Sequence, residues 1–173
     1  MQQEQVILVN EFDSQTGVME KLEAHQKALL HRAFSVFIFN SKGEMLLQQR
    51  AFQKYHSAGL WTNACCSHPR PGEDTHHAAI RRLSEEMGIT TNLEKIFSFT
   101  YKTEFDNGLT EFEFDHVYAG HYDQSIHPNV DEVNDYCFKS LQDIDHDIEA
   151  FPQKYTSWFH LAFPLVKKWV PEN

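Results

Sequence analysis

The segment Glu111-Phe112-Glu113-Phe114-Asp115 places two glutamates two residues apart in a β-prone stretch. Because strand side chains alternate between faces, Glu111 and Glu113 share one side, about 7 Å apart at Cα, and the two phenylalanines share the other. Two carboxylates so placed can bind one cation, or act as a ligand and a proton carrier. The alternative is a half-buried strand with a solvated acidic face. The pattern alone favours that alternative, because such alternation is common.

The segment Ala64-Cys65-Cys66-Ser67-His68 brings a thiol within two residues of an imidazole. If the segment is extended, Cys66 and His68 face the same way. A nearby imidazolium, metal or cationic patch would lower the pKa of the thiol, whereas burial alone would raise it. Both cysteines can instead be small packed hydrophobes, and this alternative is stronger for Cys65. The absence of a Cys-x-x-Cys pair argues against a structural zinc finger.

A third charged group lies in the run RRLSEEMG at residues 81–88. On a helix, its two arginines and two glutamates are i,i+4 pairs that would form surface salt bridges. The same glutamates, with Glu73 ahead of the helix, would also suit Mg²⁺ bound to a diphosphate, because Mg²⁺ prefers oxygen ligands. The sequence allows both interpretations.

Eleven histidines in 173 residues favour metal binding or acid–base chemistry but do not show where in the chain it takes place. Any one histidine is more often a surface or core residue. Five residues could together bind one metal ion: His25, His31, His68, Glu111 and Glu113. Three nitrogens and two oxygens suit six-coordinate Mn²⁺, Mg²⁺ or Zn²⁺ better than a tetrahedral structural zinc. Spacing does not establish this site, since His25 and His31 are separated by neither one nor two helical turns.

The composition is that of a folded protein, with 41% apolar residues including 14 Phe and 3 Trp. The formal net charge of −10 argues against nucleic acid or anionic lipid as a partner, so an anionic substrate would need a local basic patch. Three cysteines, two of them adjacent, do not fit a disulfide framework. The N-terminus lacks a signal-peptide pattern and no window approaches a membrane span. We therefore expect a cytoplasmic, reduced protein.

Hydrophobic periodicity predicts an α/β or α+β fold in a single domain over residues 1–173, because strands alternate with a few helices and no linker interrupts them. The predicted strands are 6–9, 33–39, 44–50, 97–105, 109–119 and 130–138. The predicted helices are 18–30, 76–87, 141–148 and 156–169. Turns at 40–43 and 106–108 would close two hairpins, Asp74 or Thr75 would cap the second helix, and Pro164 would bend or divide the last one.

Several segments match one family in order, from about residue 20 to 160. They are LLHRAFSVFIFN (29–40), LLQQRAFQKYHSAGLWTNACCSHPRPGE (46–73), RRLSEEMGI (81–89), the Tyr101 region and EFEFDHVY (111–118). Together they resemble type I isopentenyl-diphosphate isomerases, a branch of the Nudix superfamily, and the combination of TN-x-x-C-x-HP with E-x-E is specific to that branch. The resemblance implies a Nudix-like fold of mixed β-sheets with flanking helices, its core at about residues 30–165.

The Nudix signature, G-x5-E-x7-R-E-u-x-E-E-x-G-u with u aliphatic, aligns with residues 67–89 and departs at two positions. Ser67 replaces the first glycine, and Arg82 replaces the glutamate that follows the arginine. The second change exchanges a metal-binding carboxylate for a fixed cation. That exchange weakens the case for diphosphate hydrolysis and suits binding of a diphosphate that must survive.

The resemblance also implies roles for individual residues. Ligands of a buried Mn²⁺, Mg²⁺ or Zn²⁺ would be His25, His31, His68, Glu111 and Glu113. Glu86 would hold Mg²⁺ at the substrate diphosphate, with the main-chain carbonyl of Cys66. Substrate would be bound by Lys21, Arg50, Lys54, Arg82 and Trp158, the last at the hydrocarbon end. Protons would be carried by Cys66 and Glu113, with Tyr101 supporting Glu113.

The implied reaction moves the double bond of isopentenyl diphosphate to give dimethylallyl diphosphate. Protonation of the terminal carbon makes a tertiary carbocation, and proton loss from C2 completes the shift. We expect a monomer whose partner is this small prenyl diphosphate. Two alternatives are a Nudix hydrolase of a diphosphate, which leaves Cys66 without a role, and a non-catalytic metal-binding or prenyl-diphosphate-sensing module, which would bind without turnover.

Overall fold

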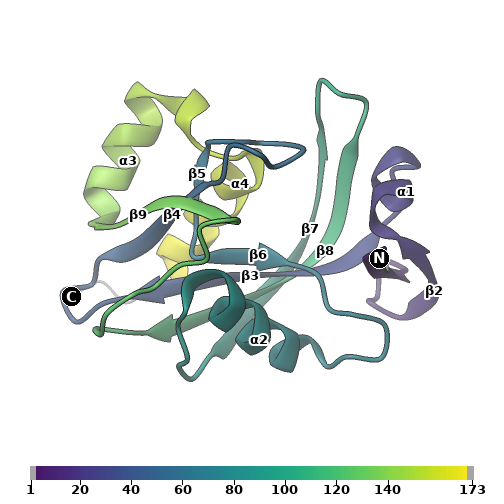
Figure 1. The fold of residues 1–173 in the computed structure, drawn as a ribbon, viewed down its shortest axis with the longest axis horizontal. Coiled ribbons are helices and arrows are strands. Elements are labelled where there is room, and N and C mark those ends of the chain that lie inside the picture. Colours follow the sequence, from purple (N-terminus) through teal and green to yellow (C-terminus); the bar gives the residue numbers. More distant parts are fainter. Residues whose placement is uncertain (1–2, 171–173) are drawn as a thin grey trace.

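Strand β3 (His31–Phe39) is the central strand of a mixed sheet (Figure 1). Its residues 34–36 pair both with β6 (Cys65–Ser67), antiparallel, and with β8 (Thr110–His121), parallel. Because a strand has only two edges, β6 and β8 lie on opposite sides of β3. The cysteine segment and the glutamate segment therefore flank one strand.

The computed structural model describes residues 3–170. The other strands of the sheet in this range are β1 (Gln5–Val9), β2 (Gln15–Glu20), β4 (Met45–Arg50), β5 (Trp61–Thr62), β7 (Glu94–Glu104) and β9 (Val133–Lys139). The helices are α1 (Lys21–Gln26), α2 (Thr75–Met87), α3 (Leu141–Ala150) and α4 (Ser157–Trp169), with a short 3-10 helix η1 (Pro152–Lys154). The expected α+β fold, a single domain with a mixed sheet and flanking helices, is confirmed.

Helices cover both faces of the sheet (Figure 1). Phe34, Val36 and Ile38 of β3 pack in one buried cluster with the apolar face of α2. Phe37 and Phe39, which point the opposite way, pack in a second cluster with residues of α3 and α4. Residues 36–39 of this strand are apolar on both sides because both sides are covered, as expected for a central strand. No helix within residues 3–170 is long and apolar enough to cross a membrane.

The ends of the helices follow local capping chemistry. The Asp74 side chain accepts a hydrogen bond from the His77 N–H at 3.0 Å, and Gly88 ends α2 in the left-handed conformation. Ser140 and Thr156 cap α3 and α4 in the same way. Pro164 lies inside α4 without dividing it, so of the two expected effects, a bend or a division, the division does not occur.

Two predictions about local structure are wrong. The expected helix 18–30 is shorter, because residues 15–20 form β2 and pair with β1, and α1 begins only at Lys21. The expected hairpin of 33–39 with 44–50 exists only at its turn, where Phe39 pairs with Met45. Beyond that pair β4 leaves β3 and pairs with β5 and β9. A local hairpin of β1 with β2 decides the first case, and pairing with distant strands decides the second. The second hairpin, β7 with β8, is confirmed.

Candidate metal and proton-transfer site

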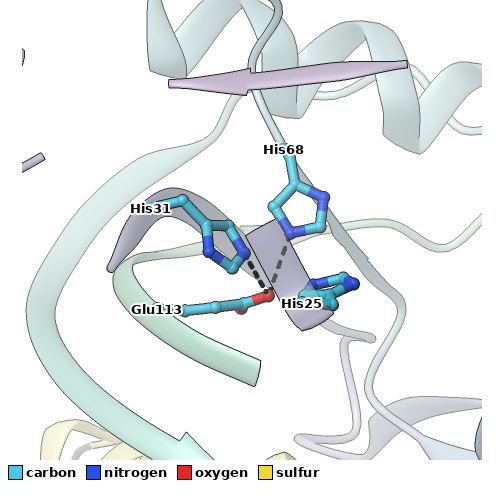
Figure 2. Close-up of side chains that lie close together, drawn as sticks. All are labelled: His25, His31, His68 and Glu113. Carbon is cyan, nitrogen blue, oxygen red and sulfur yellow. Dashed lines mark hydrogen bonds and ion pairs between the residues drawn. The ribbon is translucent and has the colours of Figure 1, made fainter. Parts of the chain in front are cut away.

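Four side chains from separate segments converge at one end of β3 (Figure 2). His25 comes from α1, His31 opens β3, His68 follows β6, and Glu113 lies on β8 directly opposite His31 in the strand register. Their ligand atoms all lie within 4.8 Å of one another. The ring centroid of His31 is 5.1 Å from that of His25 and 5.0 Å from that of His68. The fold thus gathers four of the five predicted metal ligands.

The chemistry of this cluster fits a divalent cation. Nε2 of His25 and Nε2 of His31 are buried and have no hydrogen-bond partner among residues 3–170. The Nδ1–H of His31 donates to the Leu29 carbonyl at 2.9 Å, which leaves its Nε2 lone pair facing the cluster. Burial and the neighbouring imidazoles lower the pKa of His25 to about 3, so the ring is neutral, the form that binds metals.

Glu113 is the carboxylate of this cluster. Its Oε1 lies 2.9 Å from Nε2 of His68 and 3.3 Å from Nε2 of His31, the latter without hydrogen-bond alignment. Burial raises the pKa of Glu113, but His68 and His31 outweigh it and lower that pKa below its usual range. Glu113 therefore stays ionised, as a metal ligand must.

Tyr101 joins the two glutamates of the E-x-E segment. Its hydroxyl lies 2.7 Å from Oε1 of Glu111 and 2.6 Å from Oε2 of Glu113. Both carboxylates are buried on one side of β8, so the shared side is confirmed and the solvated acidic face is wrong. Burial and the charge of Glu113 raise the pKa of Glu111. Glu111 stands outside the four-residue cluster, and its Oε2 lies 3.3 Å from Nε2 of His56.

Cys66 lies on the other side of β3, opposite Ser35 in the register. Its thiol donates to Oδ1 of Asn63 at 3.2 Å and lies 3.4 Å from the Ser35 hydroxyl, which donates to Oδ2 of Asp115 at 2.7 Å. Burial and the nearby carboxylate of Asp115 raise the pKa of the Cys66 thiol. In the free protein this group is therefore a neutral thiol, which can give a proton.

A single cavity of about 750 Å³ unites these groups. The predicted proton carriers Cys66, Glu113 and Tyr101 line it, together with His68, Glu86 and Glu111. The predicted substrate-binding residues also line it without exception: Lys21, Arg50, Lys54, Arg82 and Trp158. His25 and His31 lie behind this wall. The cavity therefore brings the proton-carrying side chains and the basic side chains together.

Several of the basic side chains form ion pairs with carboxylates in the free protein. Lys21 Nζ pairs with Glu4 at 2.7 Å, and Nη2 of Arg82 pairs with Glu132 at 2.6 Å. The Arg50 guanidinium instead lies over the Trp158 ring, 5.2 Å from its centroid. Glu86 is buried, 3.6 Å from Arg82, and burial raises the pKa of its carboxyl group.

Sequence reasoning missed His56, which lines the cavity together with His68. Its ring stacks on Phe105 at 4.8 Å between centroids and meets the Trp158 ring edge to face at 5.8 Å. Burial and Arg50 lower the pKa of His56 to about 3. It lies in the loop between β4 and β5, where neither periodicity nor spacing marks one histidine among eleven. Ser35 and Glu132 were also missed, because only the pairing of distant segments brings them to the site.

The mixed sheet between α2 and the α3–α4 pair is that of a NUDIX domain. The NUDIX domain family model matches residues 29–159. DR0079 from Deinococcus radiodurans superposes with a TM-score of 0.78 at 20% identity, covering 97% of this chain and 100% of that one. A MutT protein from Methanosarcina mazei superposes with a TM-score of 0.66 at 20% identity, covering 80% of this chain and 94% of that one. These low identities speak for the fold alone.

Relatives with higher sequence identity define the family within the NUDIX-domain proteins. The isopentenyl-diphosphate Delta-isomerase of Pectobacterium atrosepticum is 52% identical over 162 residues, 94% of this chain and 90% of that protein. The isopentenyl-diphosphate Delta-isomerase of Burkholderia multivorans is 41% identical over 172 residues, 96% and 98% of the two chains. This chain belongs to the isopentenyl-diphosphate Delta-isomerase family of NUDIX-domain proteins, and the resemblance expected from its motifs is confirmed.

Proposed function

We propose that this protein isomerises isopentenyl diphosphate to dimethylallyl diphosphate. One observation carries the proposal. Cys66 and the Tyr101–Glu113 pair come from strands on the two sides of β3 and line the same cavity. A 1,3-proton shift needs one group that gives a proton and another that takes one, and a shared cavity can present both to a single alkene.

Each of the two groups has a chemical role that follows from its surroundings. Cys66 is a neutral thiol held by Asn63, and Glu113 is an ionised carboxylate that accepts a hydrogen bond from Tyr101. In one direction of the reaction one group protonates carbon and the other removes a proton. Because the reaction is reversible, the two groups exchange these roles in the opposite direction.

The carbocation between the two proton transfers needs a neighbour that stabilises it without bonding to it. The Trp158 indole lines the cavity, and its ring face attracts positive charge through its quadrupole. Such a contact contributes about 2 kcal/mol when water is excluded, which corresponds to roughly thirtyfold in rate. Trp158 is therefore assigned to the hydrocarbon end of the substrate.

The diphosphate is assigned to the basic side chains that line the cavity, which are Lys21, Arg50, Lys54 and Arg82. This is the local basic patch that a chain of net charge −10 needs for an anionic substrate. Glu86 would hold Mg²⁺ there, with the Cys66 main-chain carbonyl. Mg²⁺ screens the diphosphate charge when it is bound.

The histidine cluster with Glu111 and Glu113 is assigned to a second divalent ion, Mn²⁺, Mg²⁺ or Zn²⁺. A cation bound there supplies fixed positive charge that sets the proton affinity of Glu113. Tyr101 holds Glu111 and Glu113 together on one side of β8, and His31 and His68 hold the Glu113 carboxylate in place.

Incubation with isopentenyl diphosphate and Mg²⁺ in D₂O, with Mn²⁺ or Zn²⁺ added in turn, tests the proposal. Product followed by NMR should carry deuterium in a dimethylallyl methyl group, with no phosphate released. Phosphate release without rearrangement would instead identify a diphosphate hydrolase. Binding without either reaction would identify a sensing module.

The remaining assignments are also proposals. We place the NUDIX-like core at about residues 30–165 of one domain and expect a cytoplasmic monomer that binds neither nucleic acid nor membranes. The net charge of −10 supports the last point, because it opposes attraction to polyanions. Sedimentation analysis at several protein concentrations tests the monomer.

A further inference from the structure

Glu132 holds two of the basic groups assigned to the diphosphate. It lies just before β9, and its Oε1 is 2.6 Å from Nη2 of Arg82 and 3.6 Å from Nζ of Lys54. The side chains of all three residues are only about one-fifth exposed, at 20%, 18% and 23% for Glu132, Arg82 and Lys54. The carboxylate thus occupies a place where a phosphate oxygen would lie.

Main-chain hydrogen bonds fix this position. The turn that carries Glu132 is tied to α2, because the Asn129 N–H donates to the Glu86 carbonyl at 2.8 Å. It is also tied to the end of β4, because the Ala51 N–H donates to the Glu132 carbonyl at 3.0 Å. These bonds use main-chain atoms on both sides, so the placement of the turn does not depend on the Glu132 side chain. The pairing with Arg82 and Lys54 is therefore built into the fold.

Several carboxylates around Arg82 already compensate its positive charge, which disfavours binding of a free anion. Its guanidinium also donates to Glu85 at 2.7 Å and to the Ser67 hydroxyl at 3.2 Å, and it lies 3.6 Å from Glu86. Among the described residues that line the cavity, six lysines and arginines face six glutamates. A diphosphate that enters without a cation would meet Glu86 and Glu132 as repelling charges at short range.

We propose that Glu132 makes diphosphate binding depend on a divalent cation. The diphosphate displaces the Glu132 carboxylate from Arg82 and Lys54. The displaced carboxylate then lies beside Glu86, and the two negative charges together favour binding of the cation. This inference rests on the proposed function, since it takes the diphosphate to lie against Arg82 and Lys54. Diphosphate and cation then bind cooperatively, and linkage requires each to raise the affinity for the other by the same factor.

The test compares the parent protein with Glu132→Gln by calorimetry, using inorganic pyrophosphate as the probe. Each protein is titrated once in excess EDTA and once at fixed free Mg²⁺. Glu132→Gln keeps the size and removes the charge, so its affinity for metal-free pyrophosphate should rise at least about tenfold. The ratio of affinities with and without Mg²⁺ should fall by a similar factor.

Two control variants separate local charge from other causes. Asp145→Asn removes one negative charge from a pair of the same length, 2.6 Å to Lys167, away from the cavity, and should bind pyrophosphate as the parent does. Glu132→Asp keeps the charge and should keep most of the Mg²⁺ dependence. If Glu132 acted in folding alone, the Gln and Asp variants would not differ in this way in their Mg²⁺ dependence. Thermal unfolding of each variant checks that the fold is kept.

The possible outcomes distinguish this inference from the function on which it rests. Metal-free affinities that do not differ between the parent and Glu132→Gln, including both being undetectable, overturn the inference. An equal gain in metal-free pyrophosphate affinity in Asp145→Asn also overturns the inference, because the gain would then come from the total charge of the protein. A parent that fails both to bind pyrophosphate with Mg²⁺ and to isomerise in D₂O overturns the proposed function and the inference together.

Discussion

Cys65 and Cys66 are neighbours in the chain, but their thiols lie on opposite faces of the sheet. The Cys65 thiol packs in the α2 cluster and donates to Oε2 of Glu86 at 2.8 Å, whereas the Cys66 thiol donates to Asn63 and lines the cavity. The cause is the two-residue period of β6, which turns successive side chains to alternate faces. Only Cys66 can therefore meet a substrate in the cavity.

Cys66→Ala should abolish isomerisation and leave the fold intact. Removal of one of two proton carriers lowers the rate by about 10²- to 10⁴-fold, because no other thiol faces the cavity from β6. The rate of deuterium incorporation measures the loss, and thermal unfolding by circular dichroism measures the stability.

Cys65→Ala is the matched control and should keep most activity. It leaves the buried Glu86 carboxylate without a donor, so we expect a loss of about 1–3 kcal/mol in unfolding free energy instead. Near-normal turnover of Cys66→Ala together with an inactive Cys65→Ala would show that the wrong cysteine was assigned.

Glu113→Gln should also abolish isomerisation, since an amide cannot carry the proton that a carboxylate carries. The change preserves size, and the Tyr101 hydroxyl can still donate to the amide oxygen, so the fold should be retained. The same NMR assay in D₂O measures the activity. Turnover near that of the parent would remove Glu113 from the proton path and with it the proposed mechanism.

Trp158→Phe should be tolerated better than Trp158→Ala. Phenylalanine keeps a ring face toward the cation, whereas alanine removes it and costs roughly thirtyfold in kcat. Trp158 is also buried, so Trp158→Ala opens a cavity and destabilises the fold by about 3–5 kcal/mol. The comparison must therefore use kcat per folded molecule; equal kcat values for the two variants would contradict a role for the ring face.

Much of the site was predictable because strand periodicity acts over two residues. The shared side of Glu111 and Glu113, and the common direction of Cys66 and His68, follow from an extended chain without knowledge of the rest of the fold. The caps of α2 are equally local, since Asp74 and Gly88 act on their own helix.

Residues brought in by strand pairing could not be predicted. Ser35 reaches Cys66 only because β6 pairs with β3, and Glu132 reaches Arg82 only because its turn is tied to α2 and to the end of β4. The failed hairpin of β3 with β4 has the same origin, because β8 and β6 outcompete β4 for the edges of β3. Contacts of this kind depend on the whole sheet, which local patterns do not specify.

Divalent metal should stabilise the protein through the histidine cluster. After chelation, added Zn²⁺ or Mn²⁺ should raise the unfolding temperature, because a ligand at 100 times its Kd contributes about 2.7 kcal/mol. His68→Gln removes one ligand at the centre of the cluster and should reduce this shift. His146→Gln removes an exposed imidazole on α3, outside the cluster, and should leave this shift unchanged. Equal shifts in both variants would place the stabilising metal elsewhere.

Gly88→Ala should destabilise the protein more than Gly43→Ala. Both glycines have positive φ, 67° and 76°, so each alanine incurs about 1–2 kcal/mol for the left-handed conformation. A Cβ on Gly88 would also lie 2.5 Å from the His127 carbonyl oxygen, whereas a Cβ on Gly43 would have nothing within 4 Å. The difference in unfolding free energy therefore isolates that contact. His127 belongs to the loop that carries Glu132, so Gly88→Ala should also weaken pyrophosphate binding in Mg²⁺. If the two alanines cost the same, the loop yields freely at His127 and is not fixed by α2.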